Sequence, residues 1–327
     1  MIVRVRFAPS PTGYLHIGGL RTALYNYLFA KSCGGKIVLR IEDTDRTRFV
    51  EDAQENLIKS LKWAGIEFDE GPNIGGEFGP YIQSERFDIY REYGNKLVET
   101  GHAYYAFDTT QELEAMRERQ QKAGIAPKYD RSVMRNEFTI GKEESKKLFE
   151  SGVAYCIRLF VPQNEEIIFN DLIRESVSMI GRDVDDQILL KSDGFPTYHL
   201  ANVIDDHFMK ITHIIRGEEW LPSTPKHILL YRAFGWEVPT FAHLPLLLNK
   251  DKTKLSKRQG SVAVEDFIEM GYFKEAFVNF IALLGWNPTA DREIFSFDEL
   301  ISTFNLRKVN KSGAVFDINK LDWMNGQ

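Results

Sequence analysis

The stretch that organises the chain is Ile2-Val-Arg-Val-Arg-Phe-Ala-Pro-Ser-Pro-Thr-Gly-Tyr-Leu-His-Ile-Gly-Gly-Leu-Arg-Thr-Ala-Leu24. Its first residues alternate between apolar and basic side chains, which is the two-residue period of a strand. Pro9, Pro11 and Gly13 then interrupt any regular structure. After His16 the apolar residues recur with helical spacing. The stretch therefore predicts a strand, a tight loop and a helix in immediate succession.

The start of this helix has the features of a phosphate site. Gly18 and Gly19 fall in its first turn, where the missing Cβ lets backbone N–H groups approach a ligand closely. The positive end of the helix dipole favours an anion at the same place. Taken alone, His16-Ile-Gly-Gly19 favours an ordinary Gly-Gly turn beside a histidine over a phosphate site. The phosphate hypothesis therefore depends on the rest of the chain.

Further strands and helices alternate along the chain. A second apolar strand is predicted over residues 36–46 and runs into an acidic cluster that begins at Glu42. A later strand over 211–216 precedes a helix that we expect to be capped by Thr224. Alternation of this kind is typical of a doubly wound parallel sheet, which binds ligands at the carboxyl ends of its strands. Arg6 and Glu42 stand at two such ends.

Changes in pattern divide the chain into four predicted segments. Residues 1–101 and 193–246 carry the two halves of the parallel-sheet domain, which is Rossmann-type in character. Residues 102–192 begin with a polar helix, capped by Thr109-x-x-Glu112, and continue with mixed strands, so we expect an inserted α+β domain there. Residues 247–327 are predicted to be mainly helical.

Composition excludes several classes of protein. Of the 327 residues, 43% are hydrophobic and 27% charged, which is ordinary for a globular protein with a large core. The net charge of −6 argues against a surface that binds nucleic acid over its whole extent. Cys33 and Cys156 stand far apart, so a disulfide scaffold is not supported and a cytoplasmic location fits best. No run of 18 apolar residues occurs, so we expect no membrane partner.

One basic stretch stands out in this acidic chain. Residues 250–258 carry five Lys or Arg and one Asp, a local charge of +4. Such a run is usually a solvated loop. It is also a suitable partner for the phosphates of a nucleotide.

Six motifs in order give the chain a family resemblance. Together they resemble the bacterial glutamyl-tRNA synthetases, a class I family, over essentially the whole length of the chain. The motifs are Arg6-Phe-Ala-Pro-Ser-Pro-Thr-Gly13, His16-Ile-Gly-Gly19, Ile41-Glu-Asp-Thr-Asp45, Tyr198-His-Leu-Ala-Asn202, Arg216-Gly-Glu-Glu-Trp220 and Lys254-Leu-Ser-Lys-Arg258. The resemblance implies ATP-dependent ligation of L-glutamate to tRNA(Glu) through a glutamyl-adenylate, in protein synthesis.

The resemblance also implies roles for individual residues. His16, Lys254 and Lys257 are the expected catalytic residues, with Gly19 standing where the family's H-I-G-H motif ends in histidine. The expected ATP contacts are His16, Gly18, Gly19, Glu219, Leu247, Lys254, Ser256, Lys257 and Arg258. The expected glutamate contacts are Arg6, Ala8, Ser10, Glu42, Tyr198, Asn202 and Arg216. Asp45, Arg46 and Arg48 are expected at the acceptor end of the tRNA.

Charge explains the proposed glutamate site. An arginine binds the side-chain carboxylate well because its guanidinium is always charged and can form two parallel hydrogen bonds, while Glu42 can pair with the ammonium group. For Arg216 the alternative is a structural ion pair with a nearby acid. Trp220 is placed beside ATP, although a buried tryptophan is more often part of a core.

Cofactors and partners follow from the same resemblance. Mg²⁺ should accompany ATP as part of the substrate. The inserted domain should bind the tRNA acceptor end, and the C-terminal helices should contact its stem. Where zinc-bearing relatives have Cys-x-Cys, this chain has Ala106 and Asp108, so we expect no structural zinc and no other protein-bound metal. The family expectation is a monomer.

Two departures leave alternatives open. Relatives continue beyond Leu321-Asp-Trp-Met-Asn-Gly326 into a helical anticodon-binding domain, so we expect either a truncated form or, less favoured, a short relative. One alternative is therefore the short enzyme that glutamylates queuosine in tRNA(Asp), although its members carry the zinc cysteines. The other is a tRNA-binding scaffold without catalysis, against which the intact His16 and Lys254 argue.

Overall fold

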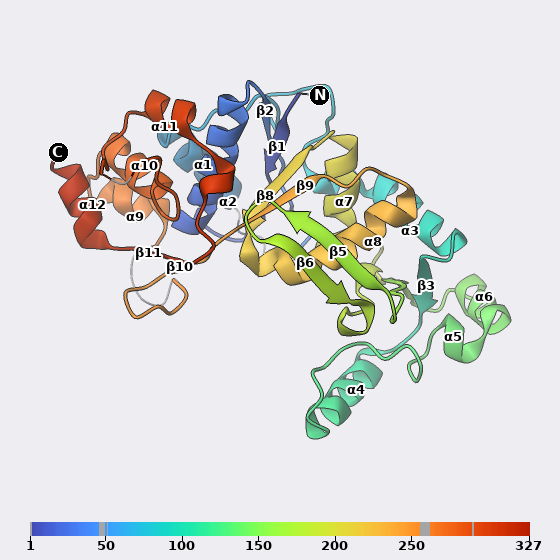
Figure 1. The fold of residues 1–327 in the computed structure, drawn as a ribbon. Coiled ribbons are helices and arrows are strands. Elements are labelled where there is room, and N and C mark those ends of the chain that lie inside the picture. Colours follow the sequence, from blue (N-terminus) through green and yellow to red (C-terminus); the bar gives the residue numbers. More distant parts are fainter. Residues whose placement is uncertain (1, 46–49, 51, 256–261, 290) are drawn as a thin grey trace.

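The computed structural model describes residues 2–45, 50, 52–255, 262–289 and 291–327 (Figure 1). The first strand, β1 (Arg4–Phe7), runs parallel to β2 (Lys36–Leu39), with Arg4 opposite Lys36 and Phe7 opposite Leu39. Helix α1 (Ile17–Ser32) connects them. The predicted succession of strand, loop, helix and strand is confirmed. The second strand ends earlier than expected, at Leu39 rather than Arg46.

The second half of the sheet resumes far along the chain. Strand β8 (His213–Gly217) pairs in parallel with β9 (Thr240–Leu244), and helix α8 (Thr224–Phe234) crosses between them. The N–H of Thr212 donates to the carbonyl of Arg4, which places β8 beside β1. The two halves therefore form one parallel layer whose carboxyl ends share an edge, as predicted for a Rossmann-type fold.

Helix α8 differs in one detail from the prediction. Its N-cap is Ser223 rather than Thr224, because the short 3-10 helix η4 (Glu218–Ser223) leads straight into it. Thr224 is the first helical residue. Its hydroxyl accepts a hydrogen bond from Arg216 of β8 instead of capping the helix. Gly235 ends the helix in the left-handed conformation, with φ of 68°.

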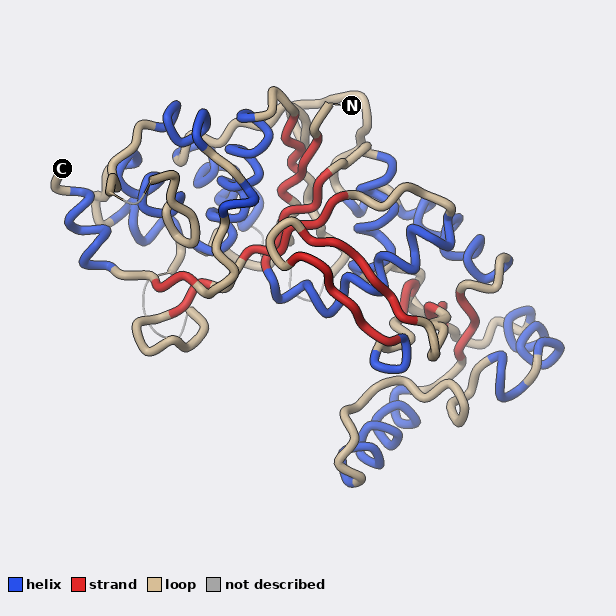
Figure 2. Tube along the Cα trace, in the orientation of Figure 1, coloured by secondary structure: helices blue, strands red, loops and turns tan. Residues whose placement is uncertain are grey.

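Both faces of the sheet are buried, and successive residues of each strand point to opposite faces. Ile37 and Ile215 pack into a core with α1, whereas their neighbours Val38 and Ile214 pack into a second core on the opposite face. The second core holds helices α3 (Phe87–Glu99), α7 (Tyr198–Phe208) and α8. The tube view in Figure 2 shows helices on both sides of the strands.

Helix α1 is buried on almost every side, which the single predicted apolar stripe did not anticipate. Helices α10 (Lys274–Ala282) and α11 (Phe297–Thr303) from the C-terminal segment cover its outer face. The buried hydroxyl of Tyr25 donates to the carbonyls of Ala282 and Leu284, at the end of α10. The C-terminal helices are thereby attached directly to the helix that begins at the Gly-Gly turn.

Residues 102–192 contribute to two sheets. Strands β3 (Ala103–Ala106), β4 (Cys156–Leu159) and β7 (Ile188–Leu190) form an antiparallel sheet, from which helix α4 (Thr110–Lys122) extends in Figure 1. Thr109 and Glu112 cap α4 as predicted. The hairpin of β5 (Glu166–Asp171) and β6 (Glu175–Ile180) instead joins the edge of β9. The four-segment division itself remains a prediction.

The remaining helices and strands are short. No helix in the described ranges is long and apolar enough to cross a membrane. The bounds are α2 (Ala53–Trp63), η2 (Gln83–Glu85), α5 (Glu137–Ile140), α6 (Lys142–Glu150), η3 (Gly181–Asp183), β10 (Leu247–Leu248), α9 (Val264–Glu269), η6 (Leu306–Lys308), β11 (Ala314–Val315) and α12 (Ile318–Asn325).

Candidate active site

A cavity of about 790 Å³ opens at the carboxyl ends of β1 and β8, in front of the first turn of α1. This is the position at which a parallel sheet of this type binds its ligands. Nine of the residues predicted from the sequence line it: Arg6, Ala8, Ser10, Gly18, Gly19, Glu42, Tyr198, Arg216 and Glu219. Asp45, expected at the tRNA acceptor end, lines it as well. The cavity therefore gathers residues from five of the six motifs.

The other predicted residues lie around this cavity or outside the described part of the chain. Asn202 is fully buried beneath it. His16, Leu247 and Lys254 lie at its border rather than in its lining. Arg46, Arg48, Ser256, Lys257 and Arg258 lie outside the described residues, so their predicted roles stay predictions.

The start of α1 confirms the expected geometry of the Gly-Gly turn. His16 is the N-cap, and its Nδ1 accepts the N–H of Gly18 at 2.9 Å. A Cβ on Gly18 would lie 3.3 Å from that nitrogen, and one on Gly19 would lie 3.0 Å from Leu15. Side chains at these two positions would crowd the turn, so glycine leaves the first turn of the helix open to the cavity.

The described residues on either side of 256–261 lie beside this turn. The N–H of Leu255 donates to the carbonyl of Leu247, and Leu247 lies within 3.9 Å of the position of a Cβ on Gly18. On the other side of residues 256–261, the N–H of Ile17 donates to the carbonyl of Val262 at 2.9 Å. Leu255 and Val262, which flank residues 256–261, are thus both anchored near the start of α1.

Beneath the cavity, Arg6 and Arg40 share a buried anion. Arg6 Nε donates to Asp206 at 3.0 Å, and Arg40 Nη1 donates to the same carboxylate at 2.7 Å. Both guanidinium groups also donate to Oδ1 of Asn202. Burial disfavours the charged form of Asp206, but Arg6 and Arg40 outweigh this effect and hold its pKa below the usual range.

Sequence reasoning missed Arg40, Asp205 and Asp206. Asp205 accepts from Arg86 at 2.7 Å and also from Gln83 and from the hydroxyl of Tyr90. The signal was available, because Arg40 directly follows an apolar strand and stands between Leu39 and Ile41, and the two acids follow apolar positions of a buried helix. Their pairing across the fold was not readable from spacing.

Glu42 is held in place by one of these missed residues. Its Oε1 accepts from Arg40 Nη2 at 3.0 Å, and the carboxyl group is only 6% exposed. Burial raises the pKa of Glu42 to about 7, although Arg40 and Arg6 oppose the shift. The group can therefore change its charge near neutral pH while lining the cavity.

Arg216 has a different environment from Arg6. Its guanidinium donates to Nε2 of His243 at 3.0 Å, to the hydroxyl of Tyr198 at 3.0 Å, to Nδ1 of His227 at 3.2 Å and to Thr224 at 2.9 Å. No carboxylate within the described ranges forms an ion pair with it, so the alternative of a structural ion pair is not observed. The protein therefore keeps a buried positive charge at the cavity without a direct counter-ion.

These contacts correct the expectation that both arms of Arg216 are open to a carboxylate. Four of the five guanidinium N–H groups have protein acceptors, which leaves one, on Nη2. The hydroxyl of Tyr198 accepts from Arg216, so its own proton remains available to a ligand. Trp220 is part of the cavity wall rather than of a core, with its ring centroid 4.1 Å from that of Tyr198.

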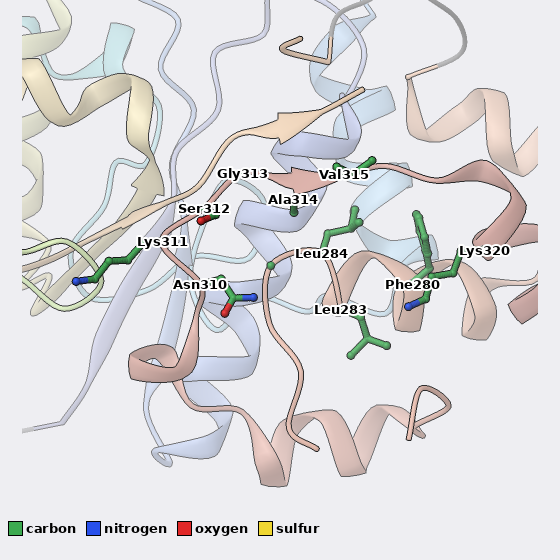
Figure 3. Close-up of a pocket in the computed structure, with 11 residues that line it drawn as sticks. Phe280, Leu283, Leu284, Asn310, Lys311, Ser312, Gly313, Ala314, Val315 and Lys320 are labelled. Atoms are coloured by element: carbon green, nitrogen blue, oxygen red, sulfur yellow. The ribbon is translucent and has the colours of Figure 1, made fainter. Parts of the chain in front are cut away.

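A second cavity, of about 490 Å³, contains none of the predicted site residues. Figure 3 shows its lining, which comes from α10 and the turn after it, from residues 310–315 and from Lys320 of α12.

In the described part of the chain, no group of three or more His, Cys, Asp or Glu is arranged to hold a metal ion. Asp108 accepts from the hydroxyl of Tyr129 and from the N–H of Arg135, both at 2.6 Å.

Comparison with known proteins agrees with this geometry. Residues 2–323 match the catalytic domain of the class I tRNA synthetases for E and Q. The chain belongs to this family. It is 58% identical to a glutamate–tRNA ligase of Chlorobaculum parvum and 56% identical to one of Alkaliphilus metalliredigens, over 99% of its own length in both cases. It spans 65% of the length of the first and 66% of the second.

Solved structures of class I relatives share the fold. A glutamate-tRNA synthetase from Elizabethkingia anophelis superposes with a TM-score of 0.95 at 47% identity, over 99% of this chain and 70% of that one. A glutamate tRNA ligase from Elizabethkingia meningosepticum, crystallised in complex with its amino acid, gives a TM-score of 0.95 at 48% identity, over 99% of this chain and 69% of that one. The Rossmann-type class I catalytic fold is therefore established for this chain.

Proposed function

We propose that this chain ligates L-glutamate to tRNA(Glu) through a glutamyl-adenylate, with MgATP as co-substrate. The observation that carries the proposal is Arg216, a buried guanidinium that lines the cavity without a direct carboxylate partner among the described side chains. A buried, uncompensated charge is unfavourable in a structural role, and a substrate carboxylate removes that cost. The glutamate–tRNA ligases that resemble the chain support the same activity.

Glutamate fits the charges that line the cavity. The free N–H of Arg216 and the proton of the Tyr198 hydroxyl are positioned for the side-chain carboxylate. Glu42, when ionised, is available to the ammonium group. Arg6 also lines the cavity and is fixed by Asp206, so its remaining N–H groups can bind an oxygen of the substrate without a change of rotamer.

The chemistry requires positioning more than it requires a protein nucleophile. The α-carboxylate of glutamate attacks the α-phosphorus of ATP, and pyrophosphate leaves as negative charge grows on the phosphates. The N-terminus of α1, held by His16 and open at Gly18 and Gly19, is the proposed seat of those phosphates. Lys254 and the Ser256 to Arg258 stretch, which follow Leu247 in sequence, are proposed to act on the pyrophosphate.

The tRNA is proposed to enter from the side of Asp45. A hydroxyl of its terminal ribose would then take the glutamyl group from the adenylate. Arg46 and Arg48 and the inserted segment 102–192 are the proposed contacts with the acceptor end. Since Cys33 and Cys156 form no disulfide, we place the enzyme in the reducing cytoplasm, and we expect it to act as a monomer.

The test is ATP–pyrophosphate exchange with the purified chain, measured with glutamate or glutamine and with or without tRNA(Glu). We expect exchange that depends on glutamate, is stimulated by tRNA and is lost in His16→Ala. The exposed His102 gives the matched control, and His102→Ala should retain activity. Direct titration of glutamate measures binding independently of the tRNA.

The outcomes separate the proposal from its alternatives. Charging of tRNA(Asp) instead of tRNA(Glu) would indicate the queuosine-modifying activity. Binding of tRNA without exchange, in this chain and in a full-length relative assayed in parallel, would indicate a scaffold without catalysis. Either result would overturn the proposed function.

A further inference from the structure

Arg216 is connected to a carboxylate on another strand through one intervening side chain, that of His243. Asp171, the last residue of β5, accepts a hydrogen bond from Nδ1 of His243 at 2.6 Å, and both side chains are fully buried. His243 lies opposite Arg216 in the parallel register of β8 and β9. Opposite residues of neighbouring strands project from the same face of the sheet, so the three side chains form one continuous chain of contacts.

The donor and the acceptor of each hydrogen bond in the series Arg216–His243–Asp171 follow from the chemistry of the three side chains. A guanidinium can only donate, so Nε2 of His243 must accept from Nε of Arg216. An ionised carboxylate can only accept, so Nδ1 of His243 must carry the proton and donate to Asp171. Burial lowers the pKa of His243 to about 4, and the hydrogen bond from His243 helps to hold the pKa of Asp171 below its usual range despite burial. At neutral pH the imidazole is therefore uncharged.

Asp171 is itself held by the backbone. Its Oδ1 accepts the N–H groups of Ile173 and Arg174 at 2.9 and 2.8 Å, at the start of the turn between β5 and β6. The backbone N–H of His243 donates to the same oxygen at 3.3 Å, so the carboxylate cannot rotate without losing three backbone hydrogen bonds. The other oxygen, Oδ2, points at His243 and determines which nitrogen of that ring is protonated.

The other neighbours of Arg216 are neutral acceptors. Thr224 and Tyr198 offer hydroxyl oxygens. His227 offers Nδ1, and burial together with the charge of Arg216 keeps the pKa of His227 well below its usual value. Arg216 is thus oriented on several sides without any direct carboxylate neutralising its charge.

We propose that Asp171 and His243 are positioning residues for Arg216, which hold its guanidinium in the orientation that binds the side-chain carboxylate of the amino acid substrate. The proposal rests on the function proposed above. Neither residue lines the cavity, and neither was among the residues predicted from the sequence. The arrangement fixes Arg216 through an uncharged imidazole, so that the full positive charge remains available to the ligand.

Two substitutions of His243 separate this role from simple packing. Glutamine places its Oε1 near the position of Nε2 and keeps an acceptor for Arg216, whereas asparagine places its amide near Nδ1 and leaves Arg216 Nε without one. Asp171→Asn adds an isosteric test. Its oxygen stays with the three backbone N–H groups, so its NH₂ faces Nδ1 of His243 and drives the proton to Nε2, against Arg216.

The measurement is the KM for glutamate in the exchange assay, alongside kcat, the KM for ATP and thermal unfolding. We expect His243→Asn and Asp171→Asn to raise the glutamate KM about tenfold or more, with kcat and the ATP KM changed less than about twofold. His243→Gln should stay within about threefold of the unsubstituted chain. His213→Gln, a partly buried histidine on β8 that contacts Phe29, is the matched control.

Equal effects of the two His243 variants, or effects that follow thermal stability alone, would overturn the proposal. The nitrogen chemical shifts of His243 supply a second measurement that needs no activity. We expect a neutral ring protonated on Nδ1, and a ring protonated on Nε2 would overturn the proposal even if a variant failed to fold. Failure of the proposed function is distinct, because it appears as absence of exchange in the unsubstituted chain.

Discussion

Replacing Arg216 by glutamine should change which amino acid the site accepts. The substitution removes the charge that lies in the cavity without a direct counter-ion among the described residues. The single free N–H on Nη2 accounts for one charge-assisted hydrogen bond to the ligand, about 1.5 to 3 kcal/mol. Tyr198 loses the donor that orients its hydroxyl, which adds about 0.5 to 1.5 kcal/mol. The affinity for glutamate should fall by about 2 to 4.5 kcal/mol, or roughly 30- to 2000-fold.

Glutamine should respond differently, because its neutral amide gains little from the charge of Arg216. The ratio of glutamate to glutamine affinity should therefore collapse in Arg216→Gln, while both ligands should bind the unsubstituted chain with a large preference for glutamate. Calorimetric titration of both amino acids measures the ratio without tRNA. Arg232→Gln is the matched control, since Arg232 pairs with Glu165 at the surface of α8.

The reasoning would be refuted by an unchanged ratio. If Arg216→Gln weakened glutamate and glutamine equally, the arginine would be acting on the shape of the site rather than on the ligand charge. A glutamate affinity within about threefold of the original would show that Arg216 makes no significant contact with the ligand. Thermal unfolding of each variant, recorded beside the titrations, ensures that folded protein is being compared.

Four other substitutions and measurements test the remaining parts of the site. Asp205→Asn should lower the free energy of unfolding by about 3 to 5 kcal/mol in urea, because it leaves Arg86 buried without its counter-charge; an unchanged midpoint would contradict this. The pKa of Glu42 is raised to about 7, so the stability contributed by its protonated form is lost as the pH rises through 7. Glutamate binding should tighten between pH 6 and 8, because the ionised carboxylate can pair with the ammonium group. Glu42→Gln should abolish this pH dependence of binding. Lys257→Ala should slow adenylate formation by roughly two to three decades and leave glutamate affinity intact, and normal turnover would remove this residue from the mechanism. Metal analysis should find no zinc bound to the chain, and one zinc per chain would show that Asp108 has been misinterpreted.

The local part of the fold was predictable because its causes are local. Alternation over Arg4 to Phe7, the prolines that follow and the helical spacing after His16 all act within a few residues, and β1 and α1 form where these patterns place them. The burial of α1 on its outer face was not predictable in the same way. It depends on α10 and α11, whose sequences lie hundreds of residues away and carry no mark of their partner.

The candidate site shows the same boundary between local and distant causes. Motif order grouped Arg6, Glu42 and Arg216 in one binding site, and all three line one cavity, while their roles stay predictions. It said nothing of Arg40 or Asp206, because their ion pair joins the residue after strand β2 to helix α7, far along the chain. The expected cap at Thr224 failed for a related reason. A 3-10 helix precedes α8, and the Thr224 hydroxyl accepts a hydrogen bond from Arg216 instead of capping its own helix.

The buried charges explain how such a site can select one ligand while remaining stable. Arg6, Arg40 and Arg86 each have a carboxylate within about 3 Å, so their charges are satisfied whether or not a ligand is present. Arg216 is held by neutral acceptors, so in the free protein only water from the cavity can solvate the remainder of its charge. A ligand that displaces this water must supply a negative charge of its own. We therefore expect the site to reject glutamine, which leaves the guanidinium unpaired. On our proposal, the neutral imidazole of His243 maintains this selectivity because it separates Arg216 from the carboxylate of Asp171.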